Sequence, residues 1–386
     1  MKEEDIIKWV SQVHPLASAS TTASALYPNP TKNQHQLPSP PESRKRHQTM
    51  PDGLNPTSKR QRIEEDVIEV NKTPRASSSR RRRPYLPAPT ASQEFVRCNT
   101  GIVGFISNNL QAEIKEQSKQ DPSFDIFGDA MFTSPGVRDQ LGPTPSFKDV
   151  AFITKEAKEC QKRMQSEAGW NMFVYYPLLY KAIYGERKHE QKQLVGFTPC
   201  TTARIIREYL PIYSQAKMVD FCIYVEPEMD DIAFNATSSL RKVLPNYVIN
   251  HTDFPPIRNS PIAISIETKR QCGAQPATAE LQIGTWHAAQ WNLLEDLIAR
   301  SGGLFDGLSF LPAIIVEGHD WSFAATTRED QKTVLWLEQR FGSTNDVVGV
   351  YKTIWGLQRL AKWASEVYWP WFRKNALGVS EETDDV

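Results

Sequence analysis

The sequence predicts an α/β (α+β) fold, and three stretches carry this prediction. Residues 262–269, Ile-Ala-Ile-Ser-Ile-Glu-Thr-Lys, are predicted to be a strand because β-branched apolar residues recur at every second position. Residues 217–225 show the same alternation, with Val, Phe, Ile and Val on one side. Residues 278–299 place leucines at helical spacing, which predicts a long helix directly after the isoleucine strand.

Composition limits the class of protein. The chain has 386 residues, enough for one large domain or two small ones, and its 45 basic and 45 acidic residues balance. This balance argues against a protein that coats nucleic acid with a uniformly basic surface. The five cysteines are scattered without a Cys-x-x-Cys pair, so neither a zinc knuckle nor a disulfide framework is indicated, and a reducing compartment is the simpler interpretation.

The amino terminus, Met-Lys-Glu-Glu-Asp, is acidic where a secretory signal would be basic. No apolar run approaches the about 20 residues that span a bilayer, so we expect a soluble intracellular protein without membrane contact. Residues 5–13 have a broken apolar stripe that predicts a short helix. Because this helix is too short to be stable alone, it either docks on the main domain or binds a partner.

From about residue 15 to 89 the chain is rich in Ser, Thr, Pro and Gln, and its apolar residues are too sparse to offset the entropy of ordering. We expect this segment to be a disordered tail. It contains three basic clusters, 44–46, 59–62 and 80–83. They can be solvated charge, contacts to phosphate, or signals read by a nuclear import receptor; we favour import, and hence a nuclear location.

Ordered structure is expected to resume within 102–114, or at the latest at Phe147. Residues 147–163 predict a helix, and a second helix begins with Ser166 as its N-cap and is bent or broken at Pro177. Glu167 lies in the first turn of that second helix. An acid there is favoured by the helix dipole, and the alternative is that it belongs to a functional site.

Two strands are expected next, at 201–213 and 217–225. The second carries Asp220 between apolar residues, and a buried carboxylate needs a cation, a hydrogen-bond donor or water. A salt bridge to Lys217 or to a distant arginine is one solution, and metal ligation is the other. Residues 226–256 are predicted to be a loop with a short helix near 238–244.

The end of the isoleucine strand suggests a metal site. Side chains alternate along a strand, so Glu267 and Lys269 point the same way, with only Ala263 and Ser265 behind them. This arrangement leaves room for a hydrated cation and a phosphate. The Glu-x-Lys spacing recurs elsewhere in polar, helix-like surroundings, but only this copy ends an isoleucine strand.

Thr278 is predicted to cap the helix that follows. Gln282, Trp286 and Gln290 form a stripe on it, which is either the edge of the core or a ligand contact. Residues 311–316 and 322–327 predict a hairpin, and a final helix begins at Ser343 or Thr344 and continues past Trp363. For the aromatic run 368–372, core packing is favoured over base stacking.

These residues resemble those of a known superfamily. The runs Glu167-Ala168-Gly169-Trp170-Asn171, Val219-Asp220 and Ile266-Glu267-Thr268-Lys269, with the run from Leu281 to Trp291, are similar to the PD-(D/E)XK nuclease-like domain common in filamentous fungal proteins. Gln282-x-x-x-Trp286 is similar to the Gln-x-x-x-Tyr of RecB-like nucleases. The resemblance implies a restriction-endonuclease-like α-β-β-β-α core, with a mixed central sheet flanked by helices.

The resemblance also implies a chemistry. Asp220 and Glu267 would hold Mg²⁺, with Mn²⁺ as an alternative ion, and Glu167 would complete a second metal position. Lys269 would orient the attacking water or stabilise the phosphate in the transition state, and Gln282 would contact the substrate or the lysine. The expected activity is hydrolysis of phosphodiester bonds in nucleic acid, with DNA favoured.

Two further interpretations stay open: a nuclease-fold protein that binds nucleic acid or a protein without cutting, and an interaction protein that works through its tail. The sequence does not indicate an oligomeric state. The expected domain plan is a short helix in 1–14, a disordered basic Ser/Pro-rich tail in 15–100, a linker with partial structure in 101–146, the nuclease-like domain in 147–376 and an acidic tail in 377–386.

Overall fold

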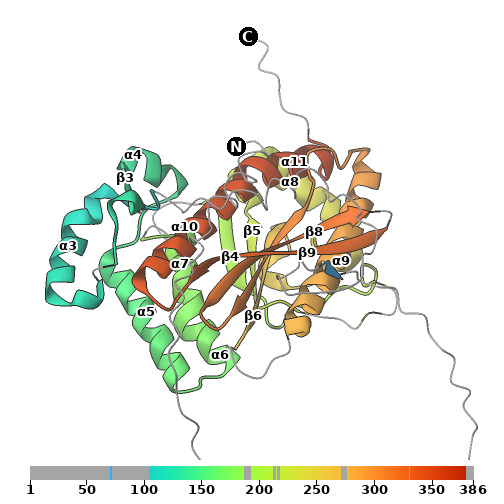
Figure 1. Ribbon diagram of the computed structural model, residues 1–386. Helices are drawn as coiled ribbons and strands as arrows, with labels where there is room; N and C mark the ends of the chain where they lie inside the picture. Colours follow the sequence, from blue (N-terminus) through green and yellow to red (C-terminus); the bar gives the residue numbers. More distant parts are fainter. Residues whose placement is uncertain are drawn as a thin grey trace, which may run out of the picture. The chain divides into compact units, whose positions relative to one another are not determined.

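A mixed seven-stranded sheet forms the centre of the described residues in the computed structural model (Figure 1). The structure describes residues 70–71, 104–124, 126–186, 193–211, 214, 218–270, 276–329 and 331–379. The strand order is β1-β9-β8-β7-β6-β5-β4, and β6–β7 and β1–β9 are the parallel pairs. The strands are β1 Val70–Asn71, β4 Val195–Pro199, β5 Phe221–Val225, β6 Ile262–Lys269, β7 Leu311–Glu317, β8 Asp320–Glu329 and β9 Lys332–Ser343.

Helices precede, interrupt and follow these strands. The α-helices and π-helical turns of this part of the chain are α5 Phe147–Lys162, α6 Glu167–Trp170, the π turn Asn171–Tyr175, α7 Tyr176–Ile183, α8 Asp231–Arg241, α9 Pro276–Ser301, α10 Val347–Trp363, the π turn Ala364–Tyr368 and α11 Trp369–Asn375. Short 3-10 turns lie at Pro227–Met229, Pro245–Tyr247 and Pro255–Ile257. The order α7-β4-β5-β6-α9 confirms the predicted α-β-β-β-α core.

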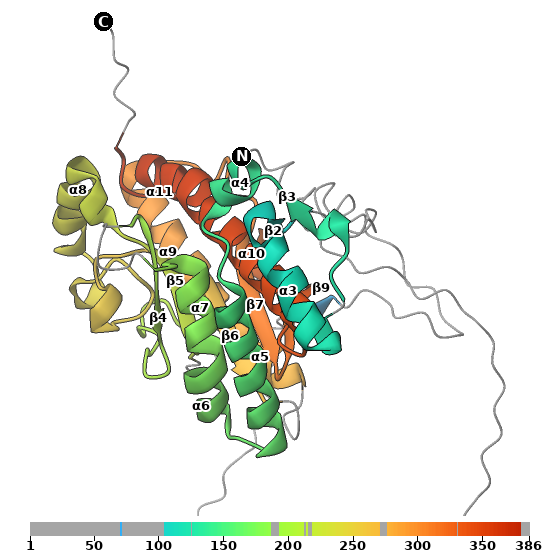
Figure 2. The same cartoon turned by 90° about the vertical axis from the view of Figure 1, so that its left-hand side faces the viewer.

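The helices pack on both faces of the sheet (Figure 2). On one face, Trp291 of α9 donates its indole N–H to Thr326 Oγ1 of β8 at 3.1 Å, and His287 Nδ1 lies 2.9 Å from the same oxygen. On the other face, the ring of Tyr175 packs edge-on against Trp321 of β8, with centroids 5.6 Å apart. Because strand side chains alternate, α9 and the π turn after α6 cover opposite faces of β8.

Two of the described helical segments continue through an internal proline, and each widens into a π turn just before it. Asn171–Tyr175 precede Pro177, and Ala364–Tyr368 precede Pro370. Proline has no N–H to donate, and its ring would clash with the carbonyl four residues earlier in a regular α-helix. The wider turn relieves that clash, so both helices continue beyond their prolines. The predicted irregularity at Pro177 is therefore confirmed as a π turn.

Most strand predictions are confirmed and one is wrong. β6 has the predicted bounds, the β7–β8 hairpin is present, and β5 is shorter than predicted, starting at Phe221. The strand expected at 201–213 does not form in its described part. There, Ile205 makes an isolated bridge to Thr252, and the chain otherwise turns.

Several helix boundaries differ from those predicted. Residues 226–256 hold a longer helix than expected, α8, because Asp230 caps it by accepting from the N–H of Ala233. Thr278 lies inside α9 instead of capping it. Asp346, not Ser343 or Thr344, caps α10, where it accepts from Gly349 at 2.7 Å. For α8 and α10, an aspartate that accepts from a backbone N–H in the first turn sets the start of the helix.

The aromatic run near the carboxyl terminus packs into the core. Tyr368 and Phe372 are each 1% exposed, and Trp369 and Trp371 are nearly as buried. This burial confirms core packing for these rings, as the density of apolar residues on α10 predicts.

Residues 104–146 form a small set of elements beside α5 and α10. They are β2 Ile106–Ser107, α3 Gln111–Gln120, β3 Phe132–Thr133 and α4 Pro135–Arg138, with short 3-10 turns between them. Arg138, which is 1% exposed, ties them together. It donates to the carbonyls of Phe105 at 2.6 Å and Gly142 at 3.1 Å, and to Gln358 Oε1 of α10 at 2.7 Å. Burial lowers the pKa of this guanidinium to about 10.

Some predictions fall outside the described residues. These are the helix in 1–14, the tail in 15–100 apart from Val70–Asn71, which pair with Leu335 and Trp336, and the end of the acidic tail from 380 onward. In the described part of the chain, no helix has the length and apolar character that crossing a membrane requires.

Arg138→Ala should lower the free energy of unfolding strongly, because three buried acceptors would lose their donor. A buried polar group without a partner costs about 1–3 kcal/mol, so we expect a loss of about 3 kcal/mol or more in urea denaturation. Arg163→Ala is the matched control, since its side chain is 71% exposed and should change stability by less than about 1 kcal/mol. Equal stability of the two variants would contradict a stabilising role for the three hydrogen bonds of Arg138.

Candidate active site

The predicted site residues meet at one end of the central strands, where β6 and β7 end. Lys269 is the register partner of Glu317, and the N–H of Gly318 donates to the carbonyl of Lys269 at 2.8 Å. Asp220 lies just before β5, and its N–H donates to the carbonyl of Ile266 at 3.0 Å. The start of β5 and the ends of β6 and β7 therefore lie together.

Register also fixes the direction of the Glu267 side chain. Glu267 pairs with Ile315 of β7, and Ile315 pairs with Ser322 of β8. Ser322 lies on the same face as Thr326, which α9 covers. Glu267 and Lys269 therefore point to the α9 side of the sheet.

Lys269 is ion-paired with two carboxylates. Its Nζ contacts Glu267 Oε1, lies 3.6 Å from Glu167 Oε2, and donates to the carbonyl of Thr268 at 2.9 Å. Burial lowers the pKa of this ammonium, but Glu267, Glu167 and Asp220 together raise the pKa by more than burial lowers it. The pKa of Lys269 therefore lies above its ordinary value. Lys269 is thus charged at neutral pH.

Glu267 is the most buried acid of the site, at 1% exposure. Its Oε1 is paired with Lys269, while its Oε2 is buried without a hydrogen-bond partner. Burial raises the pKa of Glu267 to about 8; the charge of Asp220 adds to the rise, and Lys269 opposes it. A buried acceptor without a donor is costly, so this oxygen is ready to receive a proton or a cation.

Both oxygens of Asp220 receive hydrogen bonds. Oδ1 accepts from Asn171 Nδ2 at 3.0 Å, and Oδ2 accepts from the backbone N–H of Thr268 at 2.8 Å. Thr268 Oγ1 lies 2.9 Å from Oδ2. Among the described residues, neighbouring hydrogen-bond donors rather than an arginine accommodate this buried carboxylate, and Lys217 lies outside the described residues.

Glu167 and Asn171 reach the site from the helix across the edge. Ser166 caps this helix as predicted, since its hydroxyl accepts from the N–H of Gly169 at 3.3 Å. Glu167 is a first-turn acid as predicted, and it also lies beside the other predicted site residues through its ion pair with Lys269. Burial raises the pKa of Glu167; Asp220 adds to the rise, and Lys269 opposes it.

Gln282 has a different contact from the one expected. Its Nε2 donates to the carbonyl of Met218 at 3.2 Å, two residues before Asp220. The side chain thus holds the segment that leads into Asp220. Further along the predicted stripe, Trp286 is fully buried and Gln290 donates to the carbonyl of Ile262 at 2.8 Å, so this part of the stripe belongs to the core.

The sequence did not point to Asn171 or Thr268. A signal for Asn171 was present, since it lies four residues after Glu167 and therefore on the same helix face. Thr268 points away from Glu267 and Lys269 along the strand. Only the fold reveals that Asp220 receives its hydrogen bonds on that side.

The oxygen atoms of the site fit a hard divalent cation. Within the residues that the structure describes, no three His, Cys, Asp or Glu side chains converge on a metal position. However, Oε2 of Glu267 has no hydrogen-bond partner, and the charges of Asp220 and Glu167 act on this carboxylate. Carboxylate oxygens are the ligands that Mg²⁺ prefers. Such an ion could be held by Asp220, Glu267 and Glu167 if the ammonium of Lys269 moved away from the two glutamates.

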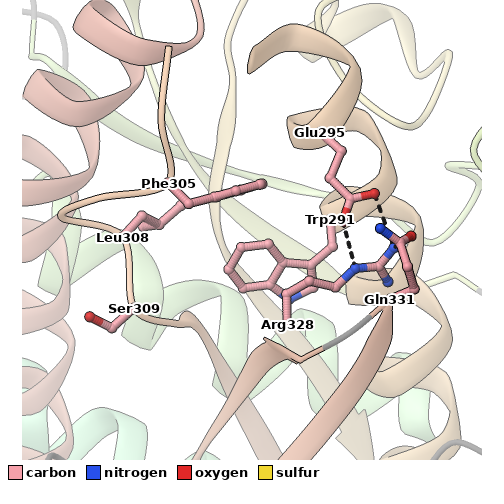
Figure 3. A pocket seen from close by; sticks show the side chains of 7 residues that line it. All are labelled: Trp291, Glu295, Phe305, Leu308, Ser309, Arg328 and Gln331. Atoms are coloured by element: carbon pink, nitrogen blue, oxygen red, sulfur yellow. Dashed lines mark hydrogen bonds and ion pairs between the residues drawn. The ribbon is translucent and has the colours of Figure 1, made fainter. Parts of the chain in front are cut away.

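A separate hollow of about 470 Å³ lies beside α9, near the start of β7 and the end of β8. Figure 3 shows the side chains that line it. Trp291, Phe305 and Leu308 form its apolar wall. Its arginine, Arg328, is engaged by both carboxylate oxygens of Glu295, at 2.8 and 3.1 Å. Its guanidinium is therefore committed to the fold, and none of the predicted site residues lines this hollow.

The fold is thus a mixed α/β fold with a buried lysine between carboxylates at the end of a central strand, beside an aspartate that immediately precedes the neighbouring strand. Residues 113–369 match the family model of the PD-(D/E)XK nuclease superfamily. This match covers more than half of the chain, and the chain belongs to that superfamily. Comparison with curated proteins and with solved structures gave no significant match.

The contribution of Glu267 to the stability of the metal-free protein should fall as the pH rises from about 5 to 8, whereas the buried histidines His251 and His287, whose pKa values are lowered to about 3, contribute a rise below about 6.5. The pKa of Glu267 is about 8 in the folded protein against an ordinary 4.5, so between these values the folded state keeps a proton that the unfolded chain has lost. The slope from this residue is at most roughly 1.4 kcal/mol per pH unit.

Urea denaturation in EDTA at several pH values measures this slope. Glu267→Gln keeps the shape without the titration, so between pH 5 and 8 its stability should gain relative to the wild type as the pH rises, whereas Glu113→Gln, at an exposed position of α3, should follow the wild type. A profile of Glu267→Gln that follows the wild type would contradict the raised pKa.

Proposed function

We propose that this protein is a Mg²⁺-dependent nuclease that hydrolyses phosphodiester bonds of nucleic acid, with DNA as its substrate. One observation carries the proposal: Asp220, Glu267 and Lys269 come from two neighbouring strands and meet at one edge of the sheet. A bound Mg²⁺, or Mn²⁺ in its place, would supply the positive charge that a reacting phosphate requires.

Each residue has a role that its environment supports. Asp220 and Glu267 offer carboxylate oxygens for the ion, and Glu167 offers a further one at the rim, where its side chain is 39% exposed. Lys269, kept charged by its acidic neighbours, would hold the attacking water or the charge that develops on the phosphate. Gln282 would act by holding the segment before Asp220.

The nuclear location is part of the proposal and has a separate basis. The basic clusters at 44–46, 59–62 and 80–83 are the sequence features that an import receptor would read, and their charge would also favour contact with phosphates. DNA is the nucleic acid that a nuclear nuclease would meet in greatest length.

A second function is supported by a specific observation. Lys269 is engaged by Glu267 and Glu167, and both oxygens of Asp220 accept hydrogen bonds, from Asn171 and Thr268. A protein that uses the nuclease fold to bind nucleic acid or a protein partner without cutting could keep such a closed arrangement. Cleavage distinguishes the two functions.

Purified wild-type protein should cut labelled plasmid, linear or single-stranded DNA in Mg²⁺ or Mn²⁺ but not in EDTA. Asp220→Ala and Lys269→Ala should each lose at least about 100-fold in rate, because each removes charge stabilisation in a buried site. Asp253→Ala and Lys119→Ala, both at exposed positions, are the matched controls and should cut like the wild type.

Metal-dependent cutting that is lost in both site variants would support the nuclease. A wild type that cuts no DNA or RNA substrate, yet binds nucleic acid equally in all variants, would favour the non-catalytic function instead.

A further inference from the structure

Asp220, Thr268 and Asn171 form a closed ring of polar contacts. Asn171 Nδ2 donates to Asp220 Oδ1 at 3.0 Å, Thr268 Oγ1 lies 2.9 Å from Asp220 Oδ2, and Thr268 Oγ1 lies 2.8 Å from Asn171 Oδ1. The ring joins the helix after Ser166 to the strands β5 and β6. All three side chains come from different elements, so the fold itself closes the ring.

The Thr268 hydroxyl cannot satisfy both of its neighbours at once. It has one proton, and the two oxygens beside it, Asp220 Oδ2 and Asn171 Oδ1, are both acceptors. The proton therefore points either to the carboxylate or to the amide. The two distances differ by only 0.1 Å, so neither choice requires a heavy atom to move.

The orientation of the Asn171 amide follows from the same ring. Its nitrogen must face the carboxylate of Asp220, because the reverse orientation would place an amide oxygen against a carboxylate oxygen. Its oxygen is then the atom that faces the Thr268 hydroxyl. Meanwhile the backbone N–H of Thr268 holds Asp220 Oδ2 at 2.8 Å whichever way the hydroxyl points.

We propose that Asn171 and Thr268 are positioning residues that hold Asp220 ready for a divalent cation. Without the cation, the Thr268 hydroxyl donates to Asp220 Oδ2. Turned to Asn171 Oδ1 instead, the hydroxyl would leave a lone pair of Asp220 Oδ2 free for a cation, while Asn171 Nδ2 and the Thr268 N–H would keep the carboxylate in place. This inference rests on the proposed metal-dependent function.

The π turn explains how Asn171 reaches this position. Asn171 is its first residue, and its carbonyl accepts from the N–H of Tyr176 five residues later. Tyr175, in the same turn, donates to the carbonyl of Gly318 at 2.6 Å and so fixes the turn to the end of β7. The turn that accommodates Pro177 thus also anchors the amide that faces Asp220.

Binding of Mn²⁺, followed by electron paramagnetic resonance of the free ion, tests the inference without an activity assay. The variants are Asn171→Ala, Thr268→Val, Thr268→Ser and Asp220→Ala, with Met172→Ala as a control because its side chain is 67% exposed on the same turn. Groups that orient a metal ligand typically change affinity by about 10–100-fold.

We expect Asn171→Ala and Thr268→Val to bind Mn²⁺ about 10-fold or more weakly, and Met172→Ala to bind like the wild type. Thr268→Ser keeps the hydroxyl and removes only the methyl group, so it should keep most of the wild-type affinity. If Thr268 acted only through packing of its methyl group, Thr268→Ser would lose affinity. Wild-type affinity in both Asn171→Ala and Thr268→Val, with binding lost in Asp220→Ala, would overturn the inference and leave the metal site standing.

An amide signal separates failure of this inference from failure of the proposed function. The Thr268 amide proton, which donates to Asp220, should shift upfield in Asn171→Ala without any metal, as seen in nitrogen-15 correlation spectra of the full chain. An unmoved Thr268 signal would overturn the positioning role. Mn²⁺ binding that is absent in the wild type, or unchanged in Asp220→Ala, would overturn the proposed metal site, and with it the readiness for a cation proposed for this ring.

Discussion

The ion pairs of Lys269 with Glu267 and Glu167 are the interaction on which the site depends. Charges removed from water are tolerated only when they are matched and hydrogen-bonded, and β6 is buried along its whole length. Lys269 can therefore stay charged only because two acids approach it from two elements, the strand and the helix after Ser166. The packing of that helix against the sheet is thus coupled to the charges of Lys269 and Glu267 on β6.

Proline explains why that helix can carry so many contacts. A regular α-helix from 167 to 183 would bring the ring of Pro177 against a carbonyl of the preceding turn. The π turn removes this conflict and changes the angular spacing of the residues within it. As a result Asn171 faces Asp220 while Tyr175 faces Gly318. The same solution at Pro370 serves packing alone, since the rings that follow it are buried.

The sequence predicts β6 and its Glu-x-Lys ending well, because alternation and β-branching are local signals that need no knowledge of the rest of the chain. It misses β9, where charged residues interrupt the apolar pattern, and β4, which is short and contains Gly196 and Pro199. Their pairing with β8 and β5 determines them as strands, and this information is not local. The start of helix α8 was predicted too late for a related reason, since its apolar side is thin and its cap at Asp230 decides where it begins.

The site shows the same division between local and non-local information. Asp220, Glu267, Lys269 and Glu167 could be named from the sequence because buried or paired charges stand out against an apolar pattern. Asn171 and Thr268 could not, since an asparagine in a helix and a threonine in a strand are unremarkable until the fold places an aspartate between them.

Stability alone gives a poor account of these charges. A buried ion pair can often be replaced by apolar side chains of similar size with little loss, and sometimes with a gain, in the free energy of unfolding. Here one carboxylate oxygen of Glu267 is left without a partner and its pKa is raised to about 8, so the folded chain carries a cost that an apolar strand end would avoid. Such local conflicts are expected where a site must offer its charge to something else. The spare oxygen beside a lysine and a hydrogen-bonded aspartate is therefore the feature of this strand end that supports the proposed cation site.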